Sequence, residues 1–348
     1  MERVAGEGFR FAGAWNGPGK AWRPAGLRRW KLVKAMVKFS VAPLLLLAAT
    51  AALASQLSTD ADSTVPHNVQ QLVVIDYQAM ENSPTAMQLR NKVMPPELKQ
   101  LQTALEKSGL NDNYDVDQLA FVLFSASPTS KTLYTVGIAE GEFSEPRIVA
   151  NFTKLKIKPI KLRTNSIYPM TKSGMVLCFV DPSTLVFGDK DAVEKALNAR
   201  DGLAPNVLTN NAMMSAMQSV DSASLWSILD AKGTQTMMSQ LLGQAGSVTN
   251  YKAVKDRLQS SWYSMNFQSG VQFNLTISTG DAFTAATMSS LLSAAILVRE
   301  MTSTAAEKNA LSATTVSSNA GQLTIHFSSS DTDFSSLLQS PLFHSVVQ

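Results

Sequence analysis

The strands expected from this sequence come in adjacent pairs, not singly between helices. Met175–Val180 and Thr184–Gly188 are short apolar runs separated by Asp181-Pro182-Ser183, a favourable turn sequence. Ser261–Gln268 and Val271–Ser278 are likewise separated only by a Ser-Gly step. Strands that follow each other so closely pair as antiparallel hairpins, whereas parallel strands need a helix between them. The sequence therefore predicts an α+β fold with hairpin-rich antiparallel sheets and helices packed on one face.

The order of these elements is repeated along the chain. Each half gives a strand, two helices, a strand pair, a helix, a further strand or hairpin and a final helix. This order predicts a duplicated unit. We expect a first α+β repeat at residues 71–202, a link at residues 203–222 and a second α+β repeat at residues 223–340.

An apolar stretch, Phe39–Ala54, precedes the first repeat. Basic residues come before it, and it ends with small residues at the positions that a signal peptidase requires, so cleavage is expected between Ala54 and Ser55. The stretch is shorter than the roughly 20 residues that span a bilayer. We therefore expect residues 1–54 to be a leader, residues 55–70 to be a flexible N-terminus, and the protein to be periplasmic or extracellular. An uncleaved leader would instead leave an N-terminal membrane tether.

The beginning of the leader has two interpretations. Met36 is followed by Val37-Lys38 and then by the apolar stretch, which makes a compact signal peptide and marks residues 1–35 as an extension of the gene model. The alternative is a twin-arginine signal around Arg28-Arg29.

Removing the leader reverses the sign of the net charge. The whole chain contains 30 Lys and Arg and 27 Asp and Glu residues, of which nine and two lie in residues 1–54. The remaining 21 basic and 25 acidic residues give a net charge of −4. A mildly acidic protein does not attract nucleic acid through its overall field, so we expect no nucleic-acid partner.

The residue types that carry catalysis are scarce and form no recognised motif. His67, His326 and His344 lack metal-ligand spacing, and Cys178 lies in an apolar run that predicts a buried side chain. Walker, G-x-G-x-x-G, G-x-S-x-G and S-x-x-K sequences are absent. We therefore predict no catalytic, metal-binding or cofactor-binding residues, and no cofactor.

Two further patterns have a structural explanation. Asn111–Asp117 resembles the start of a calcium loop but has Val116 and Val122 where glycine and glutamate are required, which predicts a polar loop. Clustered methionines can bind copper or line an adaptable groove, but their helical spacing favours core packing. These methionines are Met213, Met214, Met217, Met237 and Met238.

The best local candidate for a binding surface is basic. Cations alternate with apolar residues around Pro159, which predicts a strand with one basic face. The cations are Lys154, Lys156, Lys158, Lys161 and Arg163. One interpretation is an edge strand protected from aggregation by its lysines and its proline. The other is a contact face for an anionic partner such as lipid head groups or an acidic polymer.

A long helix is expected from Asp281 to Lys308. Its most apolar part, Leu291–Val298, is too short and too closely bounded by polar residues to span a membrane. Because this part is apolar on most sides, we expect a buried central helix.

Two stretches resemble a known group of sequences. Asp117–Phe121 leads to Thr135–Phe143, and Val180–Asp189 runs into Ala192–Leu197. Together they resemble exported bacterial proteins of the acidobacterial and planctomycete type, in which a G-x-F step into a helix and a D-x-x-T-L-V-x-G hairpin recur. The resemblance implies an exported two-repeat α+β protein and carries no site residues.

These observations favour a secreted or periplasmic binding or scaffold module that is not an enzyme. Envelope lipid, peptide and polyanion remain open as partners. The alternative is an exported, hydrolase-like enzyme whose site is assembled from carboxylates and hydroxyls that lie far apart in the sequence.

Overall fold

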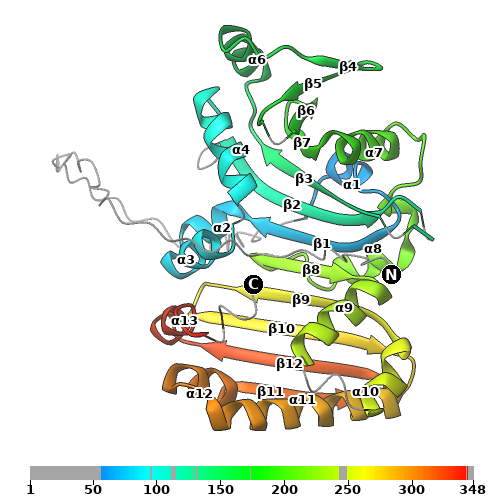
Figure 1. The fold of residues 1–348 in the computed structure, drawn as a ribbon, viewed down its shortest axis with the longest axis vertical. Coiled ribbons are helices and arrows are strands. Elements are labelled where there is room, and N and C mark those ends of the chain that lie inside the picture. Colours follow the sequence, from blue (N-terminus) through cyan, green and yellow to red (C-terminus); the bar gives the residue numbers. More distant parts are fainter. Residues whose placement is uncertain are drawn as a thin grey trace, which may run out of the picture.

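The computed structural model describes residues 56–343, except 95, 111–114, 128, 131, 173, 243–248 and 342. Its strands form one antiparallel sheet of 12 strands, which runs along the long axis of the molecule (Figure 1). The predicted α+β class and the hairpin-rich antiparallel pairing are confirmed. The sheet order is β11-β12-β10-β9-β8-β1-β2-β3-β7-β6-β5-β4.

The first half of the chain contributes seven of these strands. Its elements are α1 (Thr59–Ser63), β1 (Val69–Asp76), α2 (Tyr77–Glu81), α3 (Pro84–Val93), α4 (Pro96–Lys107), β2 (Val116–Ser125), β3 (Leu133–Gly141), α6 (Glu145–Lys154), β4 (Ile160–Leu162), β5 (Asn165–Pro169), β6 (Met175–Asp181), β7 (Thr184–Asp189) and α7 (Lys190–Arg200).

The second half contributes the other five strands. Its elements are η1 (Val207–Thr209), α8 (Asn211–Met217), β8 (Leu225–Leu229), α9 (Ala231–Leu242), α10 (Thr249–Val254), η3 (Lys255–Arg257), β9 (Leu258–Asn266), β10 (Val271–Thr279), α11 (Ala282–Thr302), α12 (Ala305–Ser312), β11 (Thr314–Asn319), β12 (Gln322–Ser329) and α13 (Asp331–Leu337).

The two halves place their strands in corresponding order. The first half gives β1-β2-β3-β7-β6, and the second gives β8-β9-β10-β12-β11. They join where β1 pairs with β8, with Leu72 opposite Ile228 and Val74 opposite Trp226. The additional strands β5 and β4 extend only the first half. This shared order is the arrangement that a duplicated unit would give, and duplication stays a prediction.

Local turn chemistry explains the hairpins. Between β6 and β7, the backbone N–H and the hydroxyl of Ser183 both donate to Asp181 Oδ1 at 2.7 Å, which closes the turn around Pro182. Between β11 and β12, Ala320 and Gly321 adopt positive φ values of 44° and 85°, as tight hairpin turns require. These short-range contacts fix the register of the two strands within each hairpin.

The sheet of the first half is covered on both of its faces, so the expectation that helices pack on one face only is wrong for this half. One face, called face A, carries Val122, Ile138 and Val186, and helices α1, α7 and α8 pack on it. The opposite face, face B, carries Phe121 and Phe187, and helices α4 and α6 pack on it. A strand covered on both faces has apolar residues at successive positions, which is why these strands are continuous apolar runs.

The sheet of the second half is covered on face A only beside the joint, where α8 packs on β8 and β9, whereas its other strands are covered on face B only. Helices α9, α10 and α11 pack there on Leu275 and Leu323, and α3 and α13 pack there on Phe327. Face A of β10 and β12 carries polar residues such as Asn274 and His326. This alternation of apolar and polar positions is typical of an antiparallel sheet with one solvated face.

The expectation of a flexible N-terminus at residues 55–70 is wrong for its described part. Ser58 caps α1 by accepting a hydrogen bond from the Ala61 N–H at 3.1 Å. Leu57, Ala61 and Val65 are buried in the core above face A. These three apolar residues are four positions apart, but the polar residues between them made the segment resemble a flexible terminus. The predicted link at residues 203–222 is also folded, because it contains η1 and α8.

The expectation of one long buried helix from Asp281 to Lys308 is also wrong. Asp281 caps α11 by accepting the Thr284 N–H at 2.8 Å, but the helix ends at Thr302. Thr304 and Glu307 then form a capping box that starts α12. Only one side of α11 packs on the sheet. By length and composition α11 is apolar enough to cross a membrane, although a core helix of a soluble protein passes the same test.

Candidate binding surface

The predicted basic strand from Lys154 to Arg163 is not a continuous strand. Ile148 and Phe152, four residues apart, are buried on face B and keep the chain helical to Lys154. The Ile157 N–H donates to the Phe152 carbonyl at 2.9 Å and the Lys156 N–H to the Thr153 carbonyl at 3.0 Å. These two bonds form a Schellman motif that ends α6.

Only three residues of the predicted strand are extended. Pro159 precedes β4, which pairs with β5 alone and forms one edge of the sheet. Arg163 has a positive φ of 54° and turns the chain from β4 into β5. The alternating charged and apolar residues from Lys154 to Arg163 therefore form the end of α6, a loop and the short strand β4. Two-residue periodicity over so few residues does not distinguish these cases.

The structure still brings the predicted cations together. Helix α6 and strand β4 lie at one end of the long axis of the molecule, where they extend beyond the main body of the sheet (Figure 1). All five cationic residues are exposed. We use the name lysine tip for Lys154, Lys156, Lys158 and Lys161.

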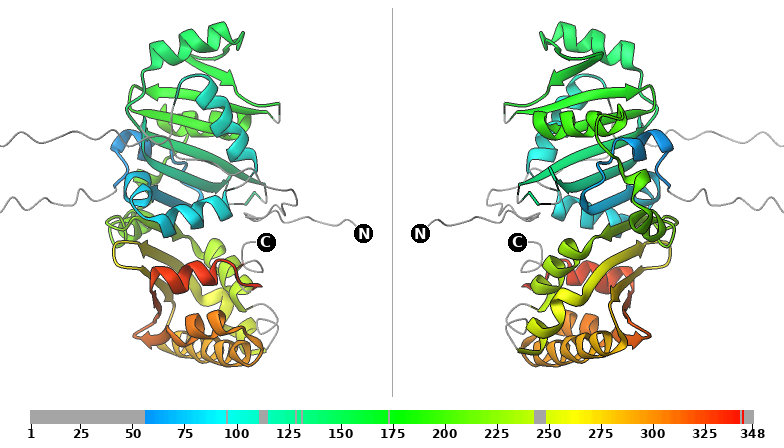
Figure 2. Two further views of the ribbon diagram at one scale, coloured as in Figure 1. Left: turned by 90° about the vertical axis from the view of Figure 1, so that its left-hand side faces the viewer. Right: turned by 90° about the vertical axis from the view of Figure 1, so that its right-hand side faces the viewer.

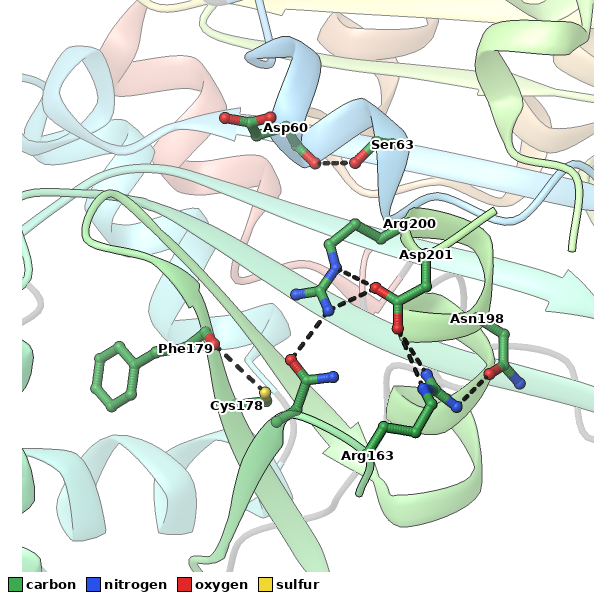
Figure 3. Close-up of polar contacts among 9 residues, drawn as sticks. Asp60, Ser63, Arg163, Cys178, Phe179, Asn198, Arg200 and Asp201 are labelled. Atoms are coloured by element: carbon green, nitrogen blue, oxygen red, sulfur yellow. Dashed lines mark hydrogen bonds and ion pairs between the residues drawn. The ribbon is translucent and has the colours of Figure 1, made fainter. Parts of the chain in front are cut away.

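Arg163, the fifth predicted cation, is engaged within the protein. Its guanidinium pairs with Asp201 Oδ2 at 2.9 Å and donates to Asn198 Oδ1 at 2.9 Å (Figure 3). Arg200 binds the other oxygen of Asp201 at 2.6 Å and also donates to Asn165. Burial alone would raise the pKa of Asp201, but the hydrogen bonds and charges of Arg200 and Arg163 outweigh it and lower that pKa.

The lysine tip has no such neutralising partner. Lys154 donates to Asn151 Oδ1 at 3.4 Å and Lys161 donates to the Ser166 hydroxyl at 2.8 Å, and both acceptors are neutral. Among the described residues, none of the four lysines forms an ion pair with a carboxylate. Their positive charges are therefore available to an external partner.

Two apolar side chains are exposed between these lysines. Leu155 is 48% exposed and Ile160 is 40% exposed. Single exposed apolar residues are ordinary, but these two alternate with the lysines on the same projecting segment. The surface thus combines positive charge with apolar groups.

Other residues with reactive side chains lie in structural positions. Cys178 is fully buried, and burial raises the pKa of its thiol to about 11, which keeps it protonated and unreactive. His67 bonds Thr209 at 2.9 Å, and His326 bonds Asn274 at 2.8 Å on the polar face A.

The two weaker patterns show no site in the described part of the chain. Met213, Met217 and Met238 are buried in the core, as their helical spacing predicted. In the calcium-like segment, residues 111–114 lie outside the described residues. Within the described ranges, no three His, Cys, Asp or Glu side chains are placed to hold a metal ion. His344, Ala54, Ser55 and the whole leader also lie outside the described residues.

Two surface hollows lack the groups expected of a hydrolytic site. One, of about 590 Å³, lies beside α9 and is lined by amides, hydroxyls, Lys232 and Lys255. The other, of about 210 Å³, is lined by Ser222, Asn266 and neighbouring polar residues. Neither lining contains a carboxylate or a histidine, the side chains that act most often as general acid or base.

An acidic pair, of which Asp62 is buried and Glu140 is partly buried, was not found from the sequence. Asp62 of α1 is only 7% exposed and lies near Glu140 of β3, although 78 positions separate the two residues. Burial, followed by the charge of Glu140, raises the pKa of Asp62 to about 7. Burial also raises the pKa of Glu140, although it accepts the Ser58 N–H at 3.1 Å. Nothing in the local sequence signals this pairing.

Several buried polar atoms near Glu140 have no hydrogen-bond partner. Asp62 Oδ1 is one of them. Gln118 Oε1 and Thr184 Oγ1 are others, and both residues lie directly opposite Glu140 in the sheet. An ionised Asp62 would therefore be buried with one oxygen lacking a hydrogen-bond partner, which disfavours its charged form. The pair lies between α1 and the sheet and lines neither hollow, so it does not resemble a catalytic cleft.

Comparisons with known proteins show similarity of backbone arrangement only. No protein-family model matches this chain, and no curated protein matches it in sequence. Crystal forms I, III and IV of TP0453 match it at 9%, 10% and 8% identity, with TM-scores of 0.46, 0.47 and 0.43. The matches cover 80%, 81% and 80% of this chain and 95%, 98% and 96% of those chains. A likeness of this size indicates neither a ligand nor an activity.

Proposed function

We propose that this chain is an exported, non-enzymatic binding protein whose lysine tip contacts an anionic lipid surface. The observation that carries the proposal is the set of four exposed lysines without a carboxylate partner, placed at one end of the molecule. Each Lys near an anionic membrane surface contributes about 1 kcal/mol of attraction. Four of them supply enough for measurable binding.

The apolar residues of the tip favour lipid over an acidic polymer. A polyanion gains little from Leu155 and Ile160, whereas a bilayer buries apolar side chains below its head groups.

The backbone of Lys156 is a second argument that the lysine tip is a binding surface. It has a φ of 59° at the position after the helix where glycine is usual, so the lysine is kept at a conformational cost of about 1 kcal/mol.

The first test replaces the four lysines of the tip by Gln. In co-sedimentation with vesicles containing phosphatidylglycerol, we expect at least a roughly 30-fold loss of affinity and loss of wild-type binding in high salt. Vesicles of phosphatidylcholine alone should bind neither protein. The control replaces four exposed lysines elsewhere, Lys92, Lys99, Lys190 and Lys252, by Gln, which gives the same net charge and should leave binding within about threefold of wild type.

A second variant distinguishes lipid from polymer. Leu155→Ser with Ile160→Ser removes the exposed apolar groups and leaves every lysine in place. We expect weaker binding to the anionic vesicles and unchanged binding to heparin. Equal vesicle binding by wild type and the four-Gln protein would refute the proposal, and unchanged vesicle binding by the Ser variant would refute the lipid assignment.

A further inference from the structure

Helix α11 presents an apolar stripe to solvent along its length. Residues spaced by three or four positions share one face of a helix. The α11 stripe comprises Phe283, Ala286, Ser290, Ala294, Leu297 and Met301, all of which are exposed. The three large members are between 64% and 82% exposed, and none of the six carries a charge. Contiguous exposed apolar surface of this kind marks an interaction site.

Five of the six residues of the stripe are placed symmetrically about Ser290, and only Met301 has no counterpart within α11. Counting from Ser290, Phe283 lies seven residues before and Leu297 seven residues after. Ala286 and Ala294 lie four residues to either side. An antiparallel copy of α11 crossing at Ser290 would therefore place Phe283 against Leu297 at both ends and small residues at the middle. A two-fold interface requires this self-complementary pattern.

The edge of the sheet beside α11 also favours a protein partner. Strand β11 is packed against α11 and is the last strand of the sheet, so its outer backbone groups are not used by another strand. It has six residues with no charge and no proline, whereas the opposite edge, β4, is short and follows Pro159. Edge strands whose outer backbone groups are not paired can pair with strands of other chains.

The charges near α11 argue against an anionic bilayer as the occupant. At the start of the helix, Arg257 is paired with Asp281 at 3.0 Å. At its end, Arg299 is followed by Glu300. Helices that lie on anionic membranes are rich in Lys and Arg along their polar flank, and this balanced set provides no such attraction.

We propose that α11 and the adjacent edge of β11 form a homodimer interface, in which α11 pairs antiparallel with α11 of a second copy about a two-fold axis near Ser290. The 21-residue helix is about 31 Å long and about 10 Å wide, so it covers roughly 300 Å² per copy. A stable dimer needs about 800 Å² per copy, so β11 and its surroundings contribute to the contact. Helix α11 lies at the end of the molecule opposite α6 (Figures 1 and 2), which leaves both lysine tips uncovered.

The test uses sedimentation velocity of the full chain, produced in an exporting host. The single variants Phe283→Lys and Leu297→Glu each place a charge opposite an apolar residue of the partner, twice per dimer. We expect each to weaken dimerisation by at least about a hundredfold. The double variant combines both substitutions, so that the new lysine of each copy lies opposite the new glutamate of the other. Its dimerisation should return to within about tenfold of wild type.

The controls keep folding separate from association. Leu203→Glu changes a side chain of similar exposure, 65%, in the turn after α7, and should leave the dimer unchanged. Far-UV circular dichroism checks that every variant is folded. A wild-type protein that is monomeric at all concentrations, or a double variant no better than the singles, overturns the proposal. Loss of vesicle binding by both single and double variants of a monomeric protein would assign the stripe to lipid instead.

Discussion

Replacing Asp62 by Asn is expected to raise the free energy of unfolding at pH 8 by roughly 2–4 kcal/mol. In the folded protein, burial and the charge of Glu140 raise the pKa of Asp62 from 3.8 to about 7. At pH 8 the wild-type Asp62 carboxylate is ionised while it is buried, which lowers the stability of the folded state by about 4 kcal/mol through linkage. Asn cannot ionise and removes this cost, although it keeps a buried polar group.

The sign of the pH dependence follows from the raised pKa. The folded protein binds the Asp62 proton more tightly than the unfolded chain, so wild-type stability falls as pH rises from about 4 to about 7. Glu140 acts in the same direction, because its pKa is also raised. Urea unfolding at pH 4.5 and pH 8 should therefore show a large gain for the Asn variant only at the higher pH.

The control for this prediction is on the same helix. Asp60→Asn removes a carboxylate from the first turn of α1, but Asp60 is exposed and only its backbone carbonyl accepts a hydrogen bond, from Ser63 (Figure 3). We expect a change below about 0.5 kcal/mol at either pH. If the Asp62 variant were less stable than wild type at pH 8, the ionised carboxylate would have a favourable partner and the prediction would be wrong.

Replacing Trp226 by Ala is expected to lower the free energy of unfolding by about 4 kcal/mol. Trp226 is fully buried on face A of β8 and lies opposite Val74 of β1, where the two halves of the sheet join. Truncation leaves a cavity among side chains from both halves, because the core above face A is continuous across this joint. Unfolding in urea should remain a single transition at a lower midpoint.

The matched control is the other tryptophan of this face. Trp262 lies on β9 opposite Ile228 and is only partly buried. Trp262→Ala should cost about 1–2 kcal/mol, since less area leaves water in the folded state. Two separate transitions in the Trp226 variant, with one midpoint unchanged, would show that the halves are not coupled through this residue.

The outcome at the lysine tip shows what a local pattern can and cannot predict. All five cations of the predicted face are exposed at one end of the molecule. Their charge was read directly from residue types. The prediction of a continuous strand through these cations was wrong, because contacts of Ile148 and Phe152 with face B keep α6 helical. The neutralisation of Arg163 was missed because Asp201 is 38 positions away.

For helix α11, too, the local pattern could not show which other segments lie beside it. Its composition indicated a buried helix, but only one side packs against β10, β11 and β12. Hydrophobicity reports how favourable burial would be and does not report whether a neighbour is present. Which side of α11 is exposed therefore depends on where the last strand of the sheet lies.

The sequence by itself determined the elements whose causes are local. The hairpin at Asp181-Pro182-Ser183, the helix start at Asp281 and the buried Cys178 follow from interactions within a few residues. Only the tertiary structure decided that both halves share one sheet, that Asp62 meets Glu140, and which side of α11 remains open. Those outcomes depend on contacts between segments far apart in the chain, and neither residue of such a pair carries a local mark of its partner.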